Sequence, residues 1–249
     1  MDPRASNAGE LFRTPVHCRV VAQAIRRSLV SDQVFRALAE DILSGRYEPG
    51  EKLPTQRALA AELGVNMASI REAVKRLEQL RLVEVRHGDA MRVRDWREHG
   101  GLDVIAHVLF RAGGLDQATL ASLLEARRLM LQEAARLAAE RRSDGQAARL
   151  QDLAERVADA PGAEAAQALD FAFMTELVEA SRNVVFVLIL NSIRQLYFER
   201  AELFRAVVAD HEELAPLYRR AAAAIVAKAA ARAAAAVGRL AALQEERLR

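Results

Sequence analysis

The sequence has almost no cysteine, no long apolar run and no excess of charge. Cys18 is the only cysteine in 249 residues, which excludes an intramolecular disulfide framework and fits a reducing compartment. No run reaches the roughly 20 apolar residues that a membrane-spanning helix needs, and residues 1–30 lack the compact apolar segment of a secretory signal. A formal net charge of +2 excludes a uniformly basic surface. We therefore expect a cytoplasmic protein that does not enter a membrane.

The residues that are abundant favour helices. Apolar residues make up 51% of the chain and charged residues 28%, as in ordinary folded proteins. Alanine, leucine, arginine and glutamate, all common here, are good helix formers. A chain of this length has room for one large domain or two smaller ones. We expect a mainly α protein.

The segment 31–95 is predicted to form helix, helix, turn, helix and hairpin, after an N-terminal extension over residues 1–30. The first helix is predicted to end at Gly45. The three helical patterns each follow a residue that caps helices well: Ser31, Thr55 and Asn66. After the third helix the apolar period changes to two in "LVEVR" and "MRVR", with the turn "HGDA" between them. That change predicts a β-hairpin.

This order of elements is that of a winged helix-turn-helix, a DNA-binding module. Its third helix enters the major groove, and the hairpin, called the wing, lies along the DNA backbone. Arg57 begins the second helix, and Arg71 and Lys75 lie on the side of the third helix that faces away from the core. Two alternatives stay open: these are the charges of any solvated surface, or the winged helix binds a protein.

The rest of the chain reads as a short linker, 96–101, followed by helices only, 102–249. Glycine, proline and asparagine breaks divide this part into candidate helices at 102–112, 116–141, 145–159, 163–181, 183–206, 210–229 and a last one to about 245. A bundle of six or seven helices would bury their apolar faces. The run "VVFVLIL", 184–190, is predicted to be a buried core segment. No Ser-His-Asp order, phosphate loop or zinc-protease motif appears, so we expect no enzyme.

Both halves resemble one family. The words "LPTQRALAAELGV", "REAVKRLE" and "HG" resemble the DNA-binding domain of the GntR family of bacterial transcription regulators. The later words "LLEARRLMLQEAARLAAE" and "NVVFVLILNSIRQLY" resemble the effector domain of its FadR subfamily, and within it the metal-free branch that responds to fatty acids. The resemblance covers about residues 32–240. It implies a homodimer on a palindromic operator of double-stranded DNA, regulated by a small-molecule effector.

The resemblance also implies which residues contact DNA. Matching motif positions suggest Arg57, Ser69 and Arg71, with His87 and Gly88 at the tip of the wing. We also expect contacts from Asn66, Met67 and Lys75 at the start and on the outer side of the third helix. Met67 and Ala68 depart from the family, which usually has arginine and threonine there. Because methionine cannot form the bidentate contact that arginine makes to guanine, we expect an operator unlike the usual one.

In the helical domain the resemblance implies effector contacts at Arg127, Asp170, Asn191, Tyr197 and Gly238. Asn191 ends an apolar run, where a buried amide would meet a ligand or cap a neighbouring helix. Many members of the subfamily hold a divalent metal with one aspartate and three histidines. Only Asp170 matches that set, since Met174 and Tyr218 occupy histidine positions, so we expect neither metal nor cofactor. The implied effector is a long-chain acyl-CoA, or alternatively a small carboxylate.

Overall fold

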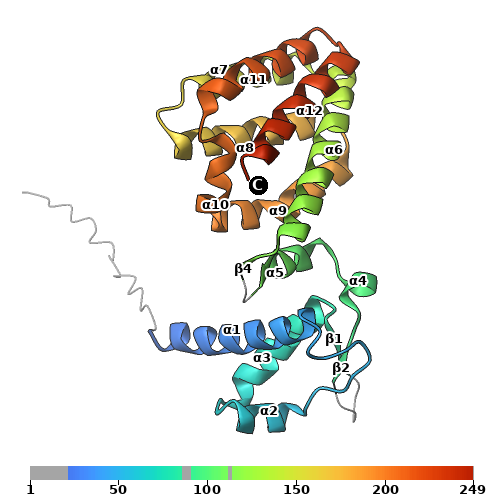
Figure 1. The fold of residues 1–249 in the computed structure, drawn as a ribbon, viewed down its shortest axis with the longest axis vertical. Helices are drawn as coiled ribbons and strands as arrows, with labels where there is room; N and C mark the ends of the chain where they lie inside the picture. The colour runs from blue at the N-terminus through green and yellow to red at the C-terminus, as the bar shows by residue number, and fades with distance from the viewer. Residues whose placement is uncertain (1–21, 86–90, 112–113, 249) are drawn as a thin grey trace, which may run out of the picture.

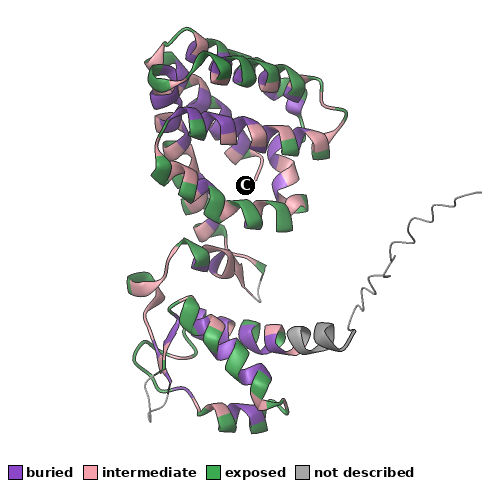
Figure 2. Ribbon diagram, turned by 180° about the vertical axis from the view of Figure 1, so that it is seen from behind, coloured by how far each residue is buried: buried purple, intermediate pink, exposed green. Residues whose placement is uncertain are grey.

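The computed structural model describes the backbone of residues 22–85, 91–111 and 114–248, and the side chains from residue 30 onward within those ranges. Two helical bodies lie toward opposite ends of the long axis, and a short segment joins them (Figure 1). Figure 2 shows the buried residues on the inward faces of the helices in both bodies. Among the described residues, no helix is long and apolar enough to cross a membrane.

The N-terminal body has the predicted order of helices and strands. Its elements are α1 (Ala22–Leu43), α2 (Gln56–Glu62), α3 (Met67–Gln79), β1 (Val83–Glu84) and β2 (Arg92–Val93). The two strands pair antiparallel, with Val83 opposite Val93. Two predicted caps are confirmed: the side chain of Thr55 accepts the amide of Ala58 at 3.2 Å, and that of Asn66 accepts the amide of Ser69 at 2.9 Å. The winged helix-turn-helix prediction is therefore confirmed over the described residues.

The predicted start of the first helix is wrong. Helix α1 begins at Ala22, and Ser31 is a fully buried residue inside it instead of an N-cap. The sequence "AQAIRRSLVSDQ" contains no glycine or proline that would interrupt a helix, so the helix continues through a serine that could otherwise have begun it. The remainder of the predicted extension, residues 1–21, lies outside the described residues.

The core of this body includes residues from beyond the predicted linker. Phe35, Ile70 and Leu77 are 0–2% exposed, and Val104 and Val108 belong to the same apolar cluster. The elements that carry and precede these valines are α4 (Trp96–His99), the 3-10 helix η1 (Leu102–Val104) and α5 (Ile105–Leu109). The segment between the two bodies is thus a set of short helices that packs on the DNA-binding body.

A small hairpin follows α5, where the sequence predicted only helix. It consists of β3 (Phe110–Arg111) and β4 (Gly114–Leu115), paired antiparallel. Gly114 has φ of 106°, a conformation that glycine adopts without strain, so the chain can reverse direction there. The prediction that residues 102–249 are all helical is wrong at this point.

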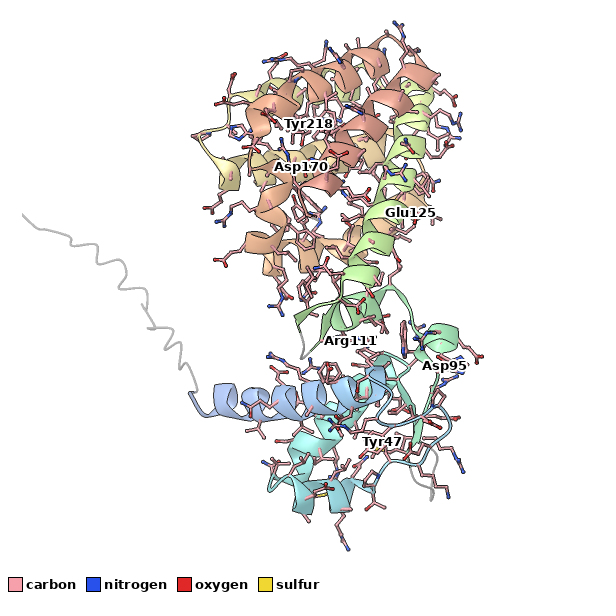
Figure 3. The ribbon with its side chains drawn as sticks, viewed as in Figure 1. Tyr47, Asp95, Arg111, Glu125, Asp170 and Tyr218 are labelled. Carbon is pink, nitrogen blue, oxygen red and sulfur yellow. The ribbon has the colours of Figure 1, made fainter. Side chains whose placement is uncertain are left out.

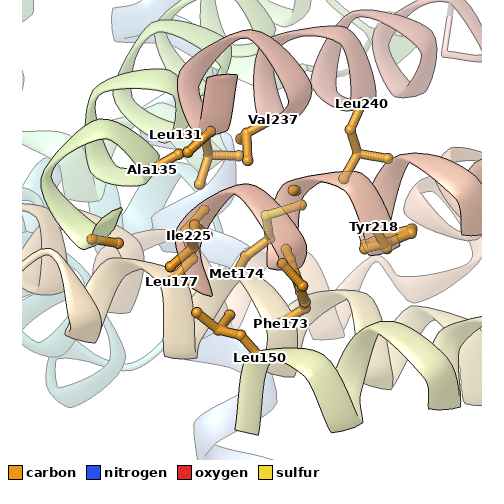
Figure 4. Packing of buried hydrophobic residues seen from close by; sticks show 14 of the residues in the cluster. Leu131, Ala135, Leu150, Phe173, Met174, Leu177, Tyr218, Ile225, Val237 and Leu240 are labelled. Atoms are coloured by element: carbon orange, nitrogen blue, oxygen red, sulfur yellow. The ribbon is translucent and has the colours of Figure 1, made fainter. Parts of the chain in front are cut away.

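The C-terminal body is a helical bundle. Its elements are α6 (Gln117–Arg141), α7 (Asp144–Ala158), α8 (Ala163–Ala180), α9 (Val184–Glu199), α10 (Ala201–Arg205), the 3-10 helix η2 (Ala206–Val208), α11 (His211–Val226) and α12 (Ala230–Glu246). The predicted breaks are confirmed, except that the helix predicted over 183–206 ends at Glu199. Figure 4 shows the core, to which α6, α7, α8, α11 and α12 all contribute.

Helix α9 is not the buried segment that its apolar sequence predicted. Val184, Val185 and Leu188 are 68%, 57% and 59% exposed, and only Leu190 and Leu196 are buried. The helix packs mainly on α8 and covers the bundle with one face. Hydrophobicity alone predicted burial, but the helix has no neighbour in this chain on its outer side over the described residues.

Candidate functional site

The exposed face of α3 is one candidate site. Ile70, Ala73, Val74 and Leu77 are buried in the core of the winged helix. This burial leaves a stripe at positions i, i+3, i+4 and i+7 exposed to solvent, which consists of Ala68, Arg71, Glu72 and Lys75. A helix whose apolar face is complete can offer its other face to a partner.

The cations near this stripe are free. Arg57 on α2 is exposed, as are Arg71 and Lys75, and none of the three forms an ion pair within the part of the chain that the structure describes. Arg76, on the other side of α3, differs from them: it pairs with Asp32, and its guanidinium lies 4.1 Å from the ring centre of Phe35. Among the cations of α3, those without an ion pair in the described part of the chain therefore lie on the exposed stripe.

The remaining predicted DNA contacts are placed less uniformly. Asn66, the N-cap of α3, is exposed. Met67 is half-buried and packs against the core of the winged helix. Ser69 is only 3% exposed, so its hydroxyl does not lie on the exposed stripe. The predicted contacts at His87 and Gly88 fall outside the described residues.

A second candidate site is a polar cluster inside the helical bundle, around Asp170 of α8. Asp170 is 1% exposed. Its Oδ1 accepts hydrogen bonds from Oη of Tyr218 at 2.5 Å and from Nε2 of Gln244 at 2.9 Å, and its Oδ2 accepts one from Oη of Tyr197 at 3.2 Å. Figure 3 shows Asp170 and Tyr218 pointing into the bundle. The carboxylate is thus held by three donors.

Both tyrosines stay protonated beside this carboxylate. Burial raises the pKa of Tyr218 well above its ordinary value, and the charge of Asp170 raises it further. The same two causes, in the same order, raise the pKa of Tyr197. Because a protonated phenol is a donor, the two hydroxyls are fixed as donors to Asp170 over the physiological pH range.

Arg127 joins the cluster through an amide. Its Nη2 donates to Oε1 of Gln244 at 2.8 Å, and the amide nitrogen of Gln244 in turn donates to Asp170. Arg127 is thus linked to Asp170 through Gln244 and not by a direct ion pair. Arg127 is half-buried and has a neutral partner, with no carboxylate at ion-pair distance among the described residues.

A cavity of about 50 Å³ adjoins the cluster. Its polar lining consists of Arg127, Asp170, Tyr197 and Gln244, at the place where the cluster meets it. The rest of the lining is apolar and comes from α6, α8, α9, α10, η2 and the end of the chain: Leu123, Leu124, Met130, Leu131, Phe171, Met174, Leu190, Ile193, Leu196, Phe204, Val207 and Leu248. The site can hold a small molecule with an apolar body and one anionic group.

Two predicted effector residues lie away from this cavity. Asn191 is exposed on α9 and near Arg194, so the expectation of a buried amide is wrong. Gly238 is buried on α12, but it faces α6, where a Cβ would overlap the side chain of Gln132. The missing side chain lets α12 pack closely on α6, and Gly238 does not line the cavity.

The residues present do not fit a divalent metal. Asp170 is a single carboxylate whose oxygens already accept three hydrogen bonds, and Met174 and Tyr218 flank it. Over the described ranges, no group of three or more histidine, cysteine, aspartate or glutamate residues could hold a metal ion. A phenol and an amide that act as donors do not replace histidine ligands.

Gln244 was not predicted as a site residue, and Tyr218 was noted only because it occupies a histidine position. A signal for Gln244 was present: Val237, Leu240, Ala241 and Gln244 share one face of α12 and all are buried. A polar residue on such an apolar stripe must find partners inside the protein. Its partners lie on α6, α8 and α11, which no local pattern identifies.

Comparison with known proteins identifies the family of both parts of the chain. The model of bacterial regulatory proteins of the gntR family matches residues 30–93, and the FCD domain model matches residues 122–242. The chain therefore belongs to the GntR family of transcription regulators, in its FadR subfamily, with a DNA-binding helix-turn-helix and an effector-binding FCD domain. These are regulators and not enzymes.

Two curated relatives and one solved structure show what the chain is similar to. It is 40% identical to the HTH-type transcriptional regulator Mce2R of Mycobacterium tuberculosis over 70% of this chain and 73% of that protein. It is 31% identical to the fatty acid metabolism regulator protein of Pasteurella multocida, over 72% of each chain. The solved structure of Lar, described as controlling the agr system of Listeria monocytogenes, has a TM-score of 0.50 at 19% identity and covers 88% of this chain and 97% of that one. The last comparison supports the fold alone.

Proposed function

We propose that the protein binds a palindromic operator as a homodimer, with α3 of each protomer in the major groove. The observation that carries this proposal is a set of three exposed cations without an ion pair among the described residues. Arg71 and Lys75 lie on the exposed stripe of α3, and Arg57 lies on α2. Such a face suits a polyanion, because each phosphate that a cation neutralises releases condensed counterions. Asn66 lies on the same side, and His87 and Gly88 are proposed to extend the contact along the wing. Ser69 is left out, since it is buried.

The two arginines have different proposed roles. Arg57 carries a planar fork that can bind a guanine edge or a phosphate, and Arg71 supplies a charge-assisted bond to a phosphate. A phosphate contact positions the protein without reading sequence, whereas a base contact specifies it. The roles can therefore be separated by measuring affinity for several duplexes.

The test is fluorescence anisotropy with random and selected duplexes over a salt series. We expect binding that weakens steeply with salt, and we expect Arg71→Ala to weaken all duplexes alike while lowering the salt slope by about 1. Arg57→Ala should also relax sequence preference. Arg156→Ala, on the helical domain, is the control and should change neither. If the Arg57 and Arg71 variants lose sequence preference equally, the two arginines do not have the proposed separate roles. If the protein binds no duplex at any salt concentration, a winged helix that binds protein is favoured instead.

The outer face of α9 supports the homodimer. Val184, Val185 and Leu188 are more than half exposed on one helix, and Leu129 of α6 is 54% exposed. Burial of a valine or leucine side chain stabilises by roughly 1.5–3 kcal/mol. We propose that a second copy of the chain covers this face.

The proposed effector is a small carboxylate with an apolar body, held in the cavity beside Arg127. The anion would take the guanidinium of Arg127 from the neutral amide of Gln244, and the apolar body would lie among Leu124, Leu131 and Ile193. A charged acceptor bonds an arginine more strongly than a neutral amide does. The cavity has room for only a few water molecules, so it suits a small ligand.

A long-chain acyl-CoA is the second candidate, because a relative of this chain is named as a fatty acid metabolism regulator. Its acyl chain would need the cavity to widen by movement of the surrounding helices. Native mass spectrometry of the purified protein would separate the two candidates, since a co-purified acyl-CoA and a bound carboxylate differ in mass. A stoichiometric transition metal would contradict the metal-free reading.

A direct binding test uses butyrate and decanoyl-CoA in thermal-shift and calorimetric titrations. Arg127→Gln should abolish the response to butyrate while keeping the fold. Arg128→Gln is the matched control on the next residue of α6: its arginine pairs with Glu245, 3.7 Å away, and does not line the cavity. A carboxylate that binds both variants equally would rule out Arg127 as the anion-binding group.

A further inference from the structure

Ala68 is the one apolar residue on the exposed stripe of α3. The stripe also carries Arg71, Glu72 and Lys75, and all four residues are exposed. Met67, its neighbour, packs against the core of the winged helix. Ala68 therefore supplies the exposed methyl group of the first turn of this helix.

The first turn of α3 is the part that comes closest to base edges. In a helix-turn-helix, the N-terminal residues of the recognition helix contact the bases, and cations further along and beside it contact phosphates. Arg71 and Lys75 lie one and two turns after Ala68, and Arg57 lies on α2. With phosphates bound by Arg71 and Lys75, the methyl group of Ala68 would face the floor of the groove.

Only one group on that floor matches a methyl group. The major-groove edges of guanine, cytosine and adenine present hydrogen-bond donors and acceptors, whereas thymine also presents its C5-methyl group. A polar base edge covered by the Cβ of alanine would lose water and gain no hydrogen bond, which is unfavourable. We propose that Ala68 specifies a thymine in each half of the operator, through contact of its Cβ with the C5-methyl group.

This inference rests on the proposed binding of DNA through α3. The test begins with selection of a high-affinity operator from a random duplex library by the full-length protein. Each thymine is then replaced by deoxyuridine, which lacks only the C5-methyl group, and binding is measured by anisotropy at constant salt. One position per half-site should respond, with binding about fourfold weaker for one half-site and about fifteenfold weaker for both, as the loss of a buried methyl group implies.

Variants of Ala68 then assign the contact. Ala68→Ser and Ala68→Gly should bind the thymine and deoxyuridine operators with equal affinity at that position. Ala235→Ser, an exposed alanine of α12, is the control and should keep the preference for thymine. The melting temperature of each variant shows whether it is folded.

Two failures can be told apart. If no duplex is enriched and no salt-dependent binding occurs, the proposed DNA-binding face fails. If an operator is bound but no thymine responds to deoxyuridine, or if Ala68→Ser keeps the full response, the thymine contact is overturned while DNA binding stands.

Discussion

Helices α3 and α9 begin with the same kind of cap but expose different kinds of side chain to solvent. Each starts at an asparagine cap, Asn66 and Asn183, and each has one face against its own body of the protein. Yet α3 buries five of its 13 residues and exposes charge, whereas α9 buries two of its 16 and exposes valine and leucine. The exposed chemistry therefore differs in kind: α3 presents cations, which would suit a polyanion, and α9 presents apolar surface that water solvates poorly.

The largest expected effect concerns the buried face of α3. Leu77 is 0% exposed, so Leu77→Ala removes buried methyl groups and leaves a cavity, at a cost of about 2–5 kcal/mol of unfolding free energy. Urea unfolding followed by circular dichroism should show the winged helix unfolding first, with DNA binding lost. Leu188→Ala, on the exposed side of α9, is the matched control and should change the stability of the monomer by about 0.5 kcal/mol or less. Similar losses of unfolding free energy in the two variants would mean that Leu77 and Leu188 do not differ in burial as described.

The next effect concerns the exposed face of α9. Leu188→Lys places a charge in the proposed contact between two copies, and we expect the dimer dissociation constant to rise about tenfold or more. Sedimentation velocity at several protein concentrations measures it. Gln151→Lys, on the exposed side of α7, is the control. A dimer that tolerates a lysine at position 188 must use another surface.

The two asparagine caps allow a closer comparison. Asn66 accepts the amide of Ser69 at 2.9 Å, and Asn183 accepts the amide of Val185 at 3.0 Å. Replacing either asparagine by alanine should cost about 1 kcal/mol. Thermal unfolding should show equal losses, while only Asn66→Ala should also weaken DNA binding. If Asn183→Ala weakened DNA binding as much, the two helices would not act separately.

The smallest expected effect is a pH dependence at His107, in a cleft whose walls include Arg76 of α3 and Ser192 of α9. Burial lowers the pKa of His107 below 6.5, and Arg76 and Arg36 lower it further, while Asp103 opposes them. Below pH 6.5 the unfolded chain therefore takes up a proton that the folded chain does not, so stability falls as pH falls through that window.

His107→Gln should remove this part of the pH dependence. The difference in melting temperature between wild type and variant should change by about 2 °C or less between pH 7.5 and 5.5. A difference that stays constant with pH would mean that His107 does not change its protonation on unfolding.

The proposed DNA-binding face was largely predictable because its signals are local. Thr55 and Asn66 cap helices through amides three residues away, and the exposed stripe of α3 follows from the helical period. Ser69 shows the limit: the family position suggested a DNA contact, whereas packing of α3 buries the residue.

The effector site was predictable only in part. Arg127, Asp170 and Tyr197 are in place around the cavity, but Gln244, which links two of them, is 74 residues from Asp170 in the sequence. Asn191 lies on the exposed side of α9, at the end of an apolar run of which only Leu190 is buried, so its predicted burial was wrong. Side chains from five helices, α6, α8, α9, α11 and α12, meet in the cluster, and no periodicity within one helix specifies which of them do.

The sequence by itself determined the local elements: the caps and breaks of the helices, the wing, and the stripe of charge on α3. These depend on interactions between residues a few positions apart. The tertiary structure decided which apolar faces are covered, so that Ser31 is buried within α1, while Val184, Val185 and Leu188 of "VVFVLIL" are exposed on α9. It also decided that Asp170 meets two tyrosines and a glutamine, because burial and partner choice depend on helices that are distant in the chain and adjacent in space.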